Sequence, residues 1–215
     1  MKEQEPKNFK YLKYLAGAEL IGSEGFPKIR PTQSIPENVI SFGEHSSCRN
    51  LEGHWLDHFV DDYKFNGVYA NCDKYLGVYS RAKGIIGTDY SAYRDMTLFM
   101  RKANVGRNRI IDYYLQSKGI DVIPVISFAY MSDFAWCLDG LPQNSSVAIS
   151  TNGSMRNLVS YYTFIDGVDE IQKRLKPSHL IIAGGPVSEL DAKYDNIIYY
   201  PNFSQRWAAR RKKNG

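Results

Sequence analysis

The sequence predicts an α/β fold organised around a mostly parallel sheet of about seven strands. Short apolar, β-branched runs recur along the chain, and segments with helical spacing separate most of the later runs. The expected strands are 39–43, 59–63, 85–88, 122–126, 147–150, 180–183 and 197–200. This alternation favours right-handed crossovers between parallel strands. We expect a compact or incomplete (β/α) barrel, with an open doubly wound sheet as the alternative, because 215 residues are few for eight barrel units of about 250 residues.

The remaining segments are expected to be a lead-in, several helices and a tail. Glycine and proline interrupt residues 1–35, which predicts an extended lead-in to a single α/β domain spanning residues 36–205. Apolar spacing predicts helices within 71–83, 94–118 and 157–175, and a short helix over 132–138 with Ser132 as its N-cap. We expect Gly106 to divide the second of these helices. Pro124 favours an edge position or a bulge in its strand.

The composition is that of a soluble globular domain, with 43% hydrophobic and 23% charged residues. No apolar run approaches the roughly 20 residues that span a bilayer. The charged N-terminus, residues 1–7, is followed by no signal-type apolar segment. Three cysteines without CxxC spacing argue for reduced thiols. These features predict a cytoplasmic protein that does not contact a membrane.

The net charge of +4 comes from the C-terminal end of the chain. Residues 206–213 contain no acidic residue, so the rest of the chain carries −1, which is the total of +4 less these +5. The five basic residues are Arg206, Arg210, Arg211, Lys212 and Lys213. A basic tail over 206–215 would bind nucleic acid through counterion release, or it is simply a solvated terminus.

Acidic residues follow two of the predicted strands. Asp61-Asp62 ends the 59–63 run, and Asp89 follows the 85–88 run. Since the carboxyl ends of parallel strands share one rim, Asp62 and Asp89 are candidate catalytic residues that divide acid and base roles. Their oxygens also allow a divalent cation such as Mg²⁺ as cofactor. The alternative is structural: Asp89 caps a turn, and Asp61 or Asp62 pairs with an arginine.

Arginines and glycine turns are the candidate phosphate ligands. Arg107 lies close to the apolar stripe of its helix, so the sequence Arg107-Asn108-Arg109 predicts one inward guanidinium, which needs a carboxylate partner or an anionic ligand. Two late strands end in polar, glycine-containing turns whose backbone amides would bind a phosphate, unless they are ordinary tight turns. The turn residues are Thr151, Asn152, Gly184 and Gly185. No dinucleotide-binding, P-loop or HExxH motif is present, and His54 and His58 lack the helical context of a metal-binding pair.

Several ordered segments resemble one known family. They are 58–65 (HFVDDYKF), 87–93 (GTDYSAY), 107–109 (RNR), 119–127 (GIDVIPVIS) and 138–151 (LDGLPQNSSVAIST). In this order they resemble the family called domain of unknown function 4417. Thr88, Tyr90 and Phe128 depart from its usual proline, phenylalanine and tryptophan. The resemblance implies a cytoplasmic protein carried by phages, plasmids or integrated elements, and it implies no particular activity, catalytic residue or cofactor.

Three functions follow as alternatives. The first is a mobile-element protein that acts on or binds nucleic acid or nucleotides at the strand-end crevice, with the basic tail adding affinity. The second is a barrel hydrolase acting on a small molecule or sugar through the carboxylate pair Asp62 and Asp89. The third is a non-catalytic protein that binds a host factor or a signalling nucleotide at the same rim.

Overall fold

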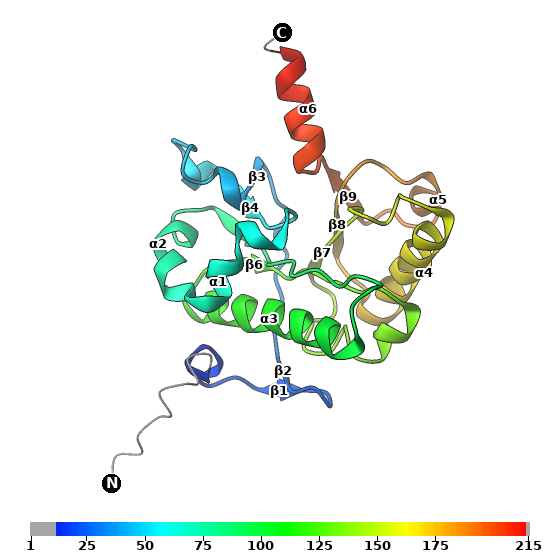
Figure 1. Cartoon of the computed structure of the whole chain (residues 1–215), viewed down its shortest axis with the longest axis horizontal. Helices are drawn as coiled ribbons and strands as arrows, with labels where there is room; N and C mark the ends of the chain where they lie inside the picture. Colours follow the sequence, from blue (N-terminus) through cyan, green and yellow to red (C-terminus); the bar gives the residue numbers. More distant parts are fainter. Residues whose placement is uncertain (1–11, 214–215) are drawn as a thin grey trace.

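The computed structural model describes residues 12–213, and Figure 1 shows the whole chain. The charged N-terminus, the first part of the expected lead-in (residues 1–11) and the last two residues of the expected tail lie outside the described part. The rest of the lead-in includes a short antiparallel hairpin, β1 (Leu20–Ile21) and β2 (Phe26–Pro27). This hairpin packs against the longest helix, α3 (Leu98–Ser117).

The main strands are parallel and follow one another in sequence order. Four of them form one sheet: β3 (Val39–Ser41), β4 (Trp55–Asp57), β5 (Gly84–Ile86) and β6 (Val122–Ile123). Three form a second sheet: β7 (Ser146–Ser150), β8 (His179–Ala183) and β9 (Ile197–Tyr200). The predicted α/β class with parallel strands is therefore confirmed. Within residues 12–213, β9 forms no ladder with β3, so the strands do not close into a barrel.

The two sheets meet at Pro124, directly after β6. The Ala148 amide donates to the Pro124 carbonyl at 2.9 Å, and the Ile126 amide donates to the Ala148 carbonyl at 2.9 Å. Val125 and Ala148 thereby form an isolated parallel bridge. Proline has no amide hydrogen to donate, which explains why the regular ladder of β6 ends here.

Helices cover the outside of the sheets (Figure 1). The α-helices besides α3 are α1 (Asn66–Ala70), α2 (Leu76–Tyr79), α4 (Leu158–Leu175), α5 (Ser188–Asp191) and α6 (Phe203–Lys213). The 3-10 helices are η1 (Leu12–Leu15), η2 (Phe42–Glu44), η3 (Leu51–Gly53), η4 (Asp62–Lys64), η5 (Cys72–Tyr75) and η6 (Met131–Ala135). In Figure 1, α1 and α2 lie beside the four-stranded sheet, α4 and α5 beside the three-stranded sheet, and α6 projects from the body.

Three local predictions were wrong, and the basic tail, whose conformation was not predicted, is helical. The strand expected over 59–63 is β4, four residues earlier. Gly106 does not divide α3; a Cβ there would lie 3.3 Å from the Phe26 ring, so the missing side chain lets the hairpin approach the helix. The short helix over 132–138 is the 3-10 helix η6, with Tyr130 in place of Ser132 at its N-cap. The basic residues after 205 belong to the regular helix α6.

One apolar cluster receives side chains from all seven parallel strands, and we call it the central cluster. Its buried members are Trp55, Phe59, Ile86, Ile123, Val125, Ala148, Ile181, Ala183 and Tyr200, with Val39 and Ile198 packed against them. Two further clusters fill the space between the sheets and the surrounding helices. The strands therefore share one interior, and their carboxyl ends surround it.

Candidate functional site

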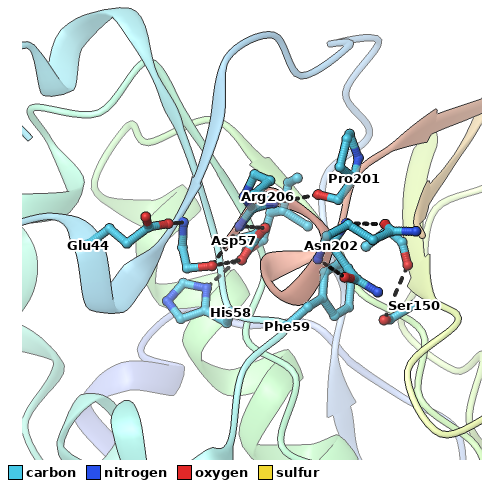
Figure 2. A network of polar contacts seen from close by, with 12 residues as sticks. Glu44, Asp57, His58, Phe59, Ser150, Pro201, Asn202 and Arg206 are labelled. Atoms are coloured by element: carbon cyan, nitrogen blue, oxygen red, sulfur yellow. Dashed lines mark hydrogen bonds and ion pairs between the residues drawn. The ribbon is translucent and has the colours of Figure 1, made fainter. Parts of the chain in front are cut away.

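Asp57 is the last residue of β4 and lies at the centre of the rim formed by the strand ends (Figure 2). Its carboxylate is completely buried. It accepts a hydrogen bond from Ser41 Oγ at 3.0 Å and forms an ion pair with Arg206 Nη2 at 3.0 Å. Burial raises the pKa of Asp57, and the positive charge of Arg206 opposes this effect. A buried carboxylate at a strand end thus depends on an arginine from the far end of the chain.

The segment after β9 lies across the rim and joins strand ends that are distant in sequence (Figure 2). Arg206, in the second turn of α6, also donates to Ser41 Oγ at 2.6 Å and to the Pro201 carbonyl at 2.7 Å. Asn202 donates to Asn152 Oδ1 at 3.1 Å, and Asn152 donates to the Phe59 carbonyl at 3.4 Å. These contacts connect the segment after β9 to the ends of β3, β4 and β7, with which β9 forms no ladder.

Two further carboxylates lie at the same rim. Asp89 accepts a hydrogen bond from Ser127 Oγ at 2.6 Å. Burial raises the pKa of Asp89 to about 6, and the negative charges of Asp62 and Asp57 contribute to the rise. Asp62 accepts hydrogen bonds from the Ser91 amide at 3.2 Å and from Ser91 Oγ at 2.8 Å. The rim therefore brings together Asp57, Asp62 and Asp89, and neither Asp62 nor Asp89 forms an ion pair within residues 12–213.

Buried polar atoms without partners accompany these carboxylates. Tyr200, at the end of β9, is 9% exposed and its buried hydroxyl lies beside the Asp57 carboxylate, while Nε of Arg206 is buried without a hydrogen-bond partner among the described residues. Burial raises the pKa of Tyr200 far above its ordinary value, and the charge of Asp57 adds to this shift. Thr88 Oγ1, just before Asp89, is also buried without a partner. Such groups are rare in folded proteins, and these lie on residues that contact or directly precede carboxylates of the rim.

The two predicted phosphate-binding arginines lie away from the rim. Arg109 is completely buried and donates to the carbonyls of Val125 at 2.8 Å and Cys137 at 3.0 Å. Burial lowers the pKa of Arg109 to about 10. Arg107 donates to Asn104 Oδ1 at 3.2 Å, and its guanidinium lies over the rings of Tyr69 and Tyr90. Their role as ligands remains a prediction.

The two glycine turns stand at the ends of β7 and β8, and their amides are largely occupied. The Thr151 amide donates to the Ala183 carbonyl at 3.1 Å, the Gly184 amide to the Tyr200 carbonyl at 2.8 Å and the Asn152 amide to Ser150 Oγ at 3.0 Å. Gly184 has φ +154, and a Cβ there would lie 2.1 Å from Thr151 Oγ1. A phosphate at Thr151, Asn152, Gly184 and Gly185 would have to displace these bonds, so that assignment also remains a prediction.

The basic residues of α6 divide into two groups. Arg206 is held by Asp57, and Arg210 forms an ion pair with Glu44. Arg211 and Lys212 are exposed and form no ion pair within the described part of the chain. The side chain of Lys213, also assigned to the tail, lies outside the described residues.

The histidines serve structural roles. His58 is buried between the Ile86 carbonyl (3.0 Å from Nδ1) and the Tyr79 hydroxyl (2.9 Å from Nε2), and burial lowers its pKa to about 4. His54 instead contacts the Asn50 carbonyl at 2.7 Å. Among residues 12–213, no three His, Cys, Asp or Glu side chains gather so as to hold a metal ion. The divalent cation therefore remains a prediction.

Sequence reasoning missed Asp57 and Tyr200 at this rim, and it did not predict that the Arg206 side chain points inward. Trp55-Leu56-Asp57 carries the same signal as the predicted strand ends, an apolar pair followed by an acid. Tyr200 ends a correctly predicted strand, so a search of every strand end for polar groups would have found it. The inward position of Arg206 has no local signal.

The fold and the rim define a parallel α/β protein with a polar site at its strand ends. The chain belongs to the family described as Domain of unknown function (DUF4417), whose sequence model matches residues 18–201. It is 31% identical over 189 residues to the Gene 1 protein of Mycobacterium phage D29, covering 87% of this chain and 69% of the phage protein. It is 29% identical over 211 residues to the Gene 1 protein of Mycobacterium phage L5, covering 97% and 90%. The resemblance inferred from the motifs is therefore confirmed.

No solved structure matches the chain significantly. None of the helices within residues 12–213 combines the length and the apolar character needed to cross a membrane.

Proposed function

We propose that this protein is a hydrolase that uses Asp62 and Asp89 as a general acid–base pair. In this proposal the seven parallel strands act as an incomplete (β/α) barrel, open between β9 and β3, whose carboxyl-end rim holds the substrate. The observation that carries the proposal is the position of Asp89 just after β5, where it accepts a hydrogen bond from Ser127 Oγ at 2.6 Å and where burial and the charges of Asp62 and Asp57 raise its pKa to about 6. Pairs of carboxyl groups whose environments differ in this way are typical of acid–base sites.

The chemistry requires no cofactor. Protonated Asp89 donates its proton to the leaving atom, while the Asp62 carboxylate removes a proton from water. The water oxygen then bonds to the carbon that loses the leaving group, so that one bond breaks and one forms. Glycosidic linkages of a sugar or a nucleotide suit this reaction.

Nucleic acid or a nucleotide is the substrate class that α6 favours. Arg211 and Lys212 are exposed on a helix whose second turn reaches Asp57 at the rim. Basic residues beside a site attract polyanions and release counterions. Similarity to two phage proteins supports a role in a mobile element. A small sugar is the competing substrate class, and a non-catalytic receptor for a nucleotide is the competing function.

The proposal is tested by screening glycosides, nucleosides, nucleotides and oligonucleotides for hydrolysis, each with and without Mg²⁺. We expect turnover that does not require the metal and that falls above about pH 6, as Asp89 loses its proton. Asp89→Asn and Asp62→Asn should each lower kcat/KM by about 10²–10⁴-fold. Asp61→Asn is the matched control, because this neighbouring carboxylate is exposed and pairs with Lys64 at 3.2 Å.

Two results would contradict the proposal. If Asp89→Asn and Asp61→Asn lowered turnover equally, the rim pair would have no special role in the reaction. If thermal-shift measurements detected ligand binding but no ligand were turned over at any pH, the receptor function would replace the catalytic one.

A further inference from the structure

Exposed aromatic side chains lie beside the rim on η4 and α6. Tyr63 is 74% exposed and Trp207 is 53% exposed, although residues of this size are usually buried in a folded domain. The rings of Phe203 and Trp207 are stacked, with centroids 6.3 Å apart and an interplanar angle of 21°. Flat rings presented to solvent in this way offer surfaces on which another planar group can stack.

A lysine connects the two aromatic elements. The Lys64 ammonium lies 5.1 Å from the ring centroid of Phe203 and 5.7 Å from that of Tyr63. These four residues, Tyr63, Lys64, Phe203 and Trp207, therefore form one continuous surface, which we call the aromatic strip. It adjoins the rim at both ends, because Asp62 directly precedes Tyr63 and Asn202 directly precedes Phe203.

The positive charge beside the aromatic strip comes from α6, whereas η4 carries Asp62 and is preceded by Asp61, which is paired with Lys64 at 3.2 Å. Within Phe203–Lys213 there is no acidic residue. Arg206 and Arg210 are already paired with Asp57 and Glu44, whereas Arg211 and Lys212 are exposed and form no ion pair in the described part of the chain. A planar, negatively charged partner therefore fits the rings of the strip and the charge of α6.

We propose that the aromatic strip binds single-stranded nucleic acid. Unpaired bases stack on exposed aromatic rings, and their phosphates are neutralised by nearby lysine and arginine. A duplex keeps its bases stacked on one another and has none to give to Tyr63 or Trp207. An acidic peptide would satisfy the charges but would leave the rings unused. This inference rests on the proposed function and names its substrate class, because the strip would lead a bound strand toward Asp62. Binding itself does not depend on turnover.

The binding test uses the full chain and fluorescence anisotropy with labelled oligo-dT, oligo-rU and a hairpin duplex. We expect the single strands to bind at least tenfold more tightly than the duplex. Trp207→Ala and Tyr63→Ala should each weaken binding to single strands by about tenfold, in keeping with base stacking on exposed rings. Trp207→Phe should retain most of the affinity. Tyr162→Ala is the control, because this tyrosine on α4 is 55% exposed, close to the 53% of Trp207.

The electrostatic part is measured separately through salt dependence. Arg211→Ala with Lys212→Ala should reduce the slope of log K against log salt by about 1.4, or about 0.7 for each lost phosphate contact. Lys118→Ala with Lys173→Ala removes the same charge near the far ends of α3 and α4 and should leave the slope unchanged.

Asp89→Asn separates the two proposals, because it should abolish turnover and retain binding. Loss of turnover with unchanged binding in this variant supports both. Binding without turnover in the wild-type protein refutes the hydrolase and keeps the strip. The strip is refuted if Trp207→Ala, folded to the wild-type melting temperature, binds oligo-dT and oligo-rU as the wild type does, or if the duplex binds equally well.

Discussion

The carboxyl ends of the two parallel sheets differ in how their polar groups are satisfied. After β4 and β5, burial and the charges of Asp62 and Asp57 raise the pKa of Asp89 to about 6. At the ends of β7 and β8, the amides of Thr151 and Gly184 donate to carbonyls of the neighbouring strands. Burial and like charges thus disfavour the ionised form of Asp89 beside the four-stranded sheet, while the turns after the three-stranded sheet form a closed network of backbone hydrogen bonds.

This difference indicates that the two sheets contribute different groups to the rim. Strained titratable groups cost stability and persist at functional sites. The three-stranded sheet contributes no carboxylate to the rim, but the chain leaving β9 supplies Arg206, which compensates Asp57. The carboxylates of the rim therefore belong to the four-stranded sheet and the segments that follow its strands, and the chain after the three-stranded sheet supplies the counter-charge of Asp57.

The largest effect is expected from breaking the ion pair between Asp57 and Arg206. Arg206→Ala leaves a completely buried carboxylate without its counter-charge, which should lower the free energy of unfolding by about 3–5 kcal/mol at pH 7. Urea unfolding measures this change. The double variant Asp57→Asn with Arg206→Ala should recover most of the loss, since no charge is then buried. A loss of less than 1 kcal/mol in the single variant would mean that the two sheets are not linked through this pair.

Asp89→Asn is expected to stabilise the protein above pH 6. The folded pKa of about 6 exceeds the unfolded value of about 3.9. Between these two pH values, the folded protein therefore holds a proton on Asp89 that the unfolded chain has lost. Wild-type stability contributed by this carboxyl is therefore lost as the pH rises from 4 through 6. The full difference corresponds to about 3 kcal/mol, and the residual solvent contact of Asp89 should reduce it to about 2 kcal/mol at pH 8.

The comparison of melting temperatures at pH 4 and pH 8 checks this effect. The variant and the wild type should agree at pH 4, where both carry an uncharged side chain at position 89. Equal stabilities at pH 8 would show that the rim does not strain Asp89.

Gly184→Ala tests the closed network of the second sheet. A Cβ there would lie 2.1 Å from Thr151 Oγ1, and φ +154 disfavours any side chain. We expect a loss of about 2 kcal/mol in urea unfolding. Gly185→Ala is the matched control, because its nearest neighbour, Gln205 Nε2, lies 3.5 Å from the added Cβ, and it should cost less than about 0.5 kcal/mol. Equal effects of the two substitutions would show that the turn has room to adjust.

Much of the fold could be predicted because its strands are short apolar runs with clear ends. The strand 197–200 was predicted with its observed bounds, since Ile197, Ile198 and two tyrosines stand between polar residues. The prediction failed at 59–63 because two apolar pairs followed by acids occur within a few residues. Pairing of Trp55 with Val39 and Gly84 selects the earlier one, and that choice depends on neighbours distant in sequence.

Only some residues of the rim could be predicted from the sequence. Asp62 and Asp89 were singled out because acids follow apolar runs, whereas their catalytic role stays a prediction. Arg206 and Asp57 are 149 residues apart, and no local pattern links them. The continuous helix α3 was missed because a central glycine lowers helix propensity, while packing of Phe26 near Gly106 outweighs it.

The smallest effect is expected from Arg210→Ala, which removes the ion pair between α6 and Glu44 of η2. The Arg210 side chain is 52% exposed and Glu44 remains anchored by its bond to the Ser41 amide at 2.9 Å, so solvent screens the pair. We expect a loss of about 0.5 kcal/mol that disappears in 1 M salt, where the Debye length is about 3 Å. Urea unfolding at low and high salt measures it, with the Arg206→Ala loss changing far less because that pair is buried. If the Arg210 substitution cost as much as Arg206→Ala, the whole length of α6, and not its second turn alone, would hold the rim.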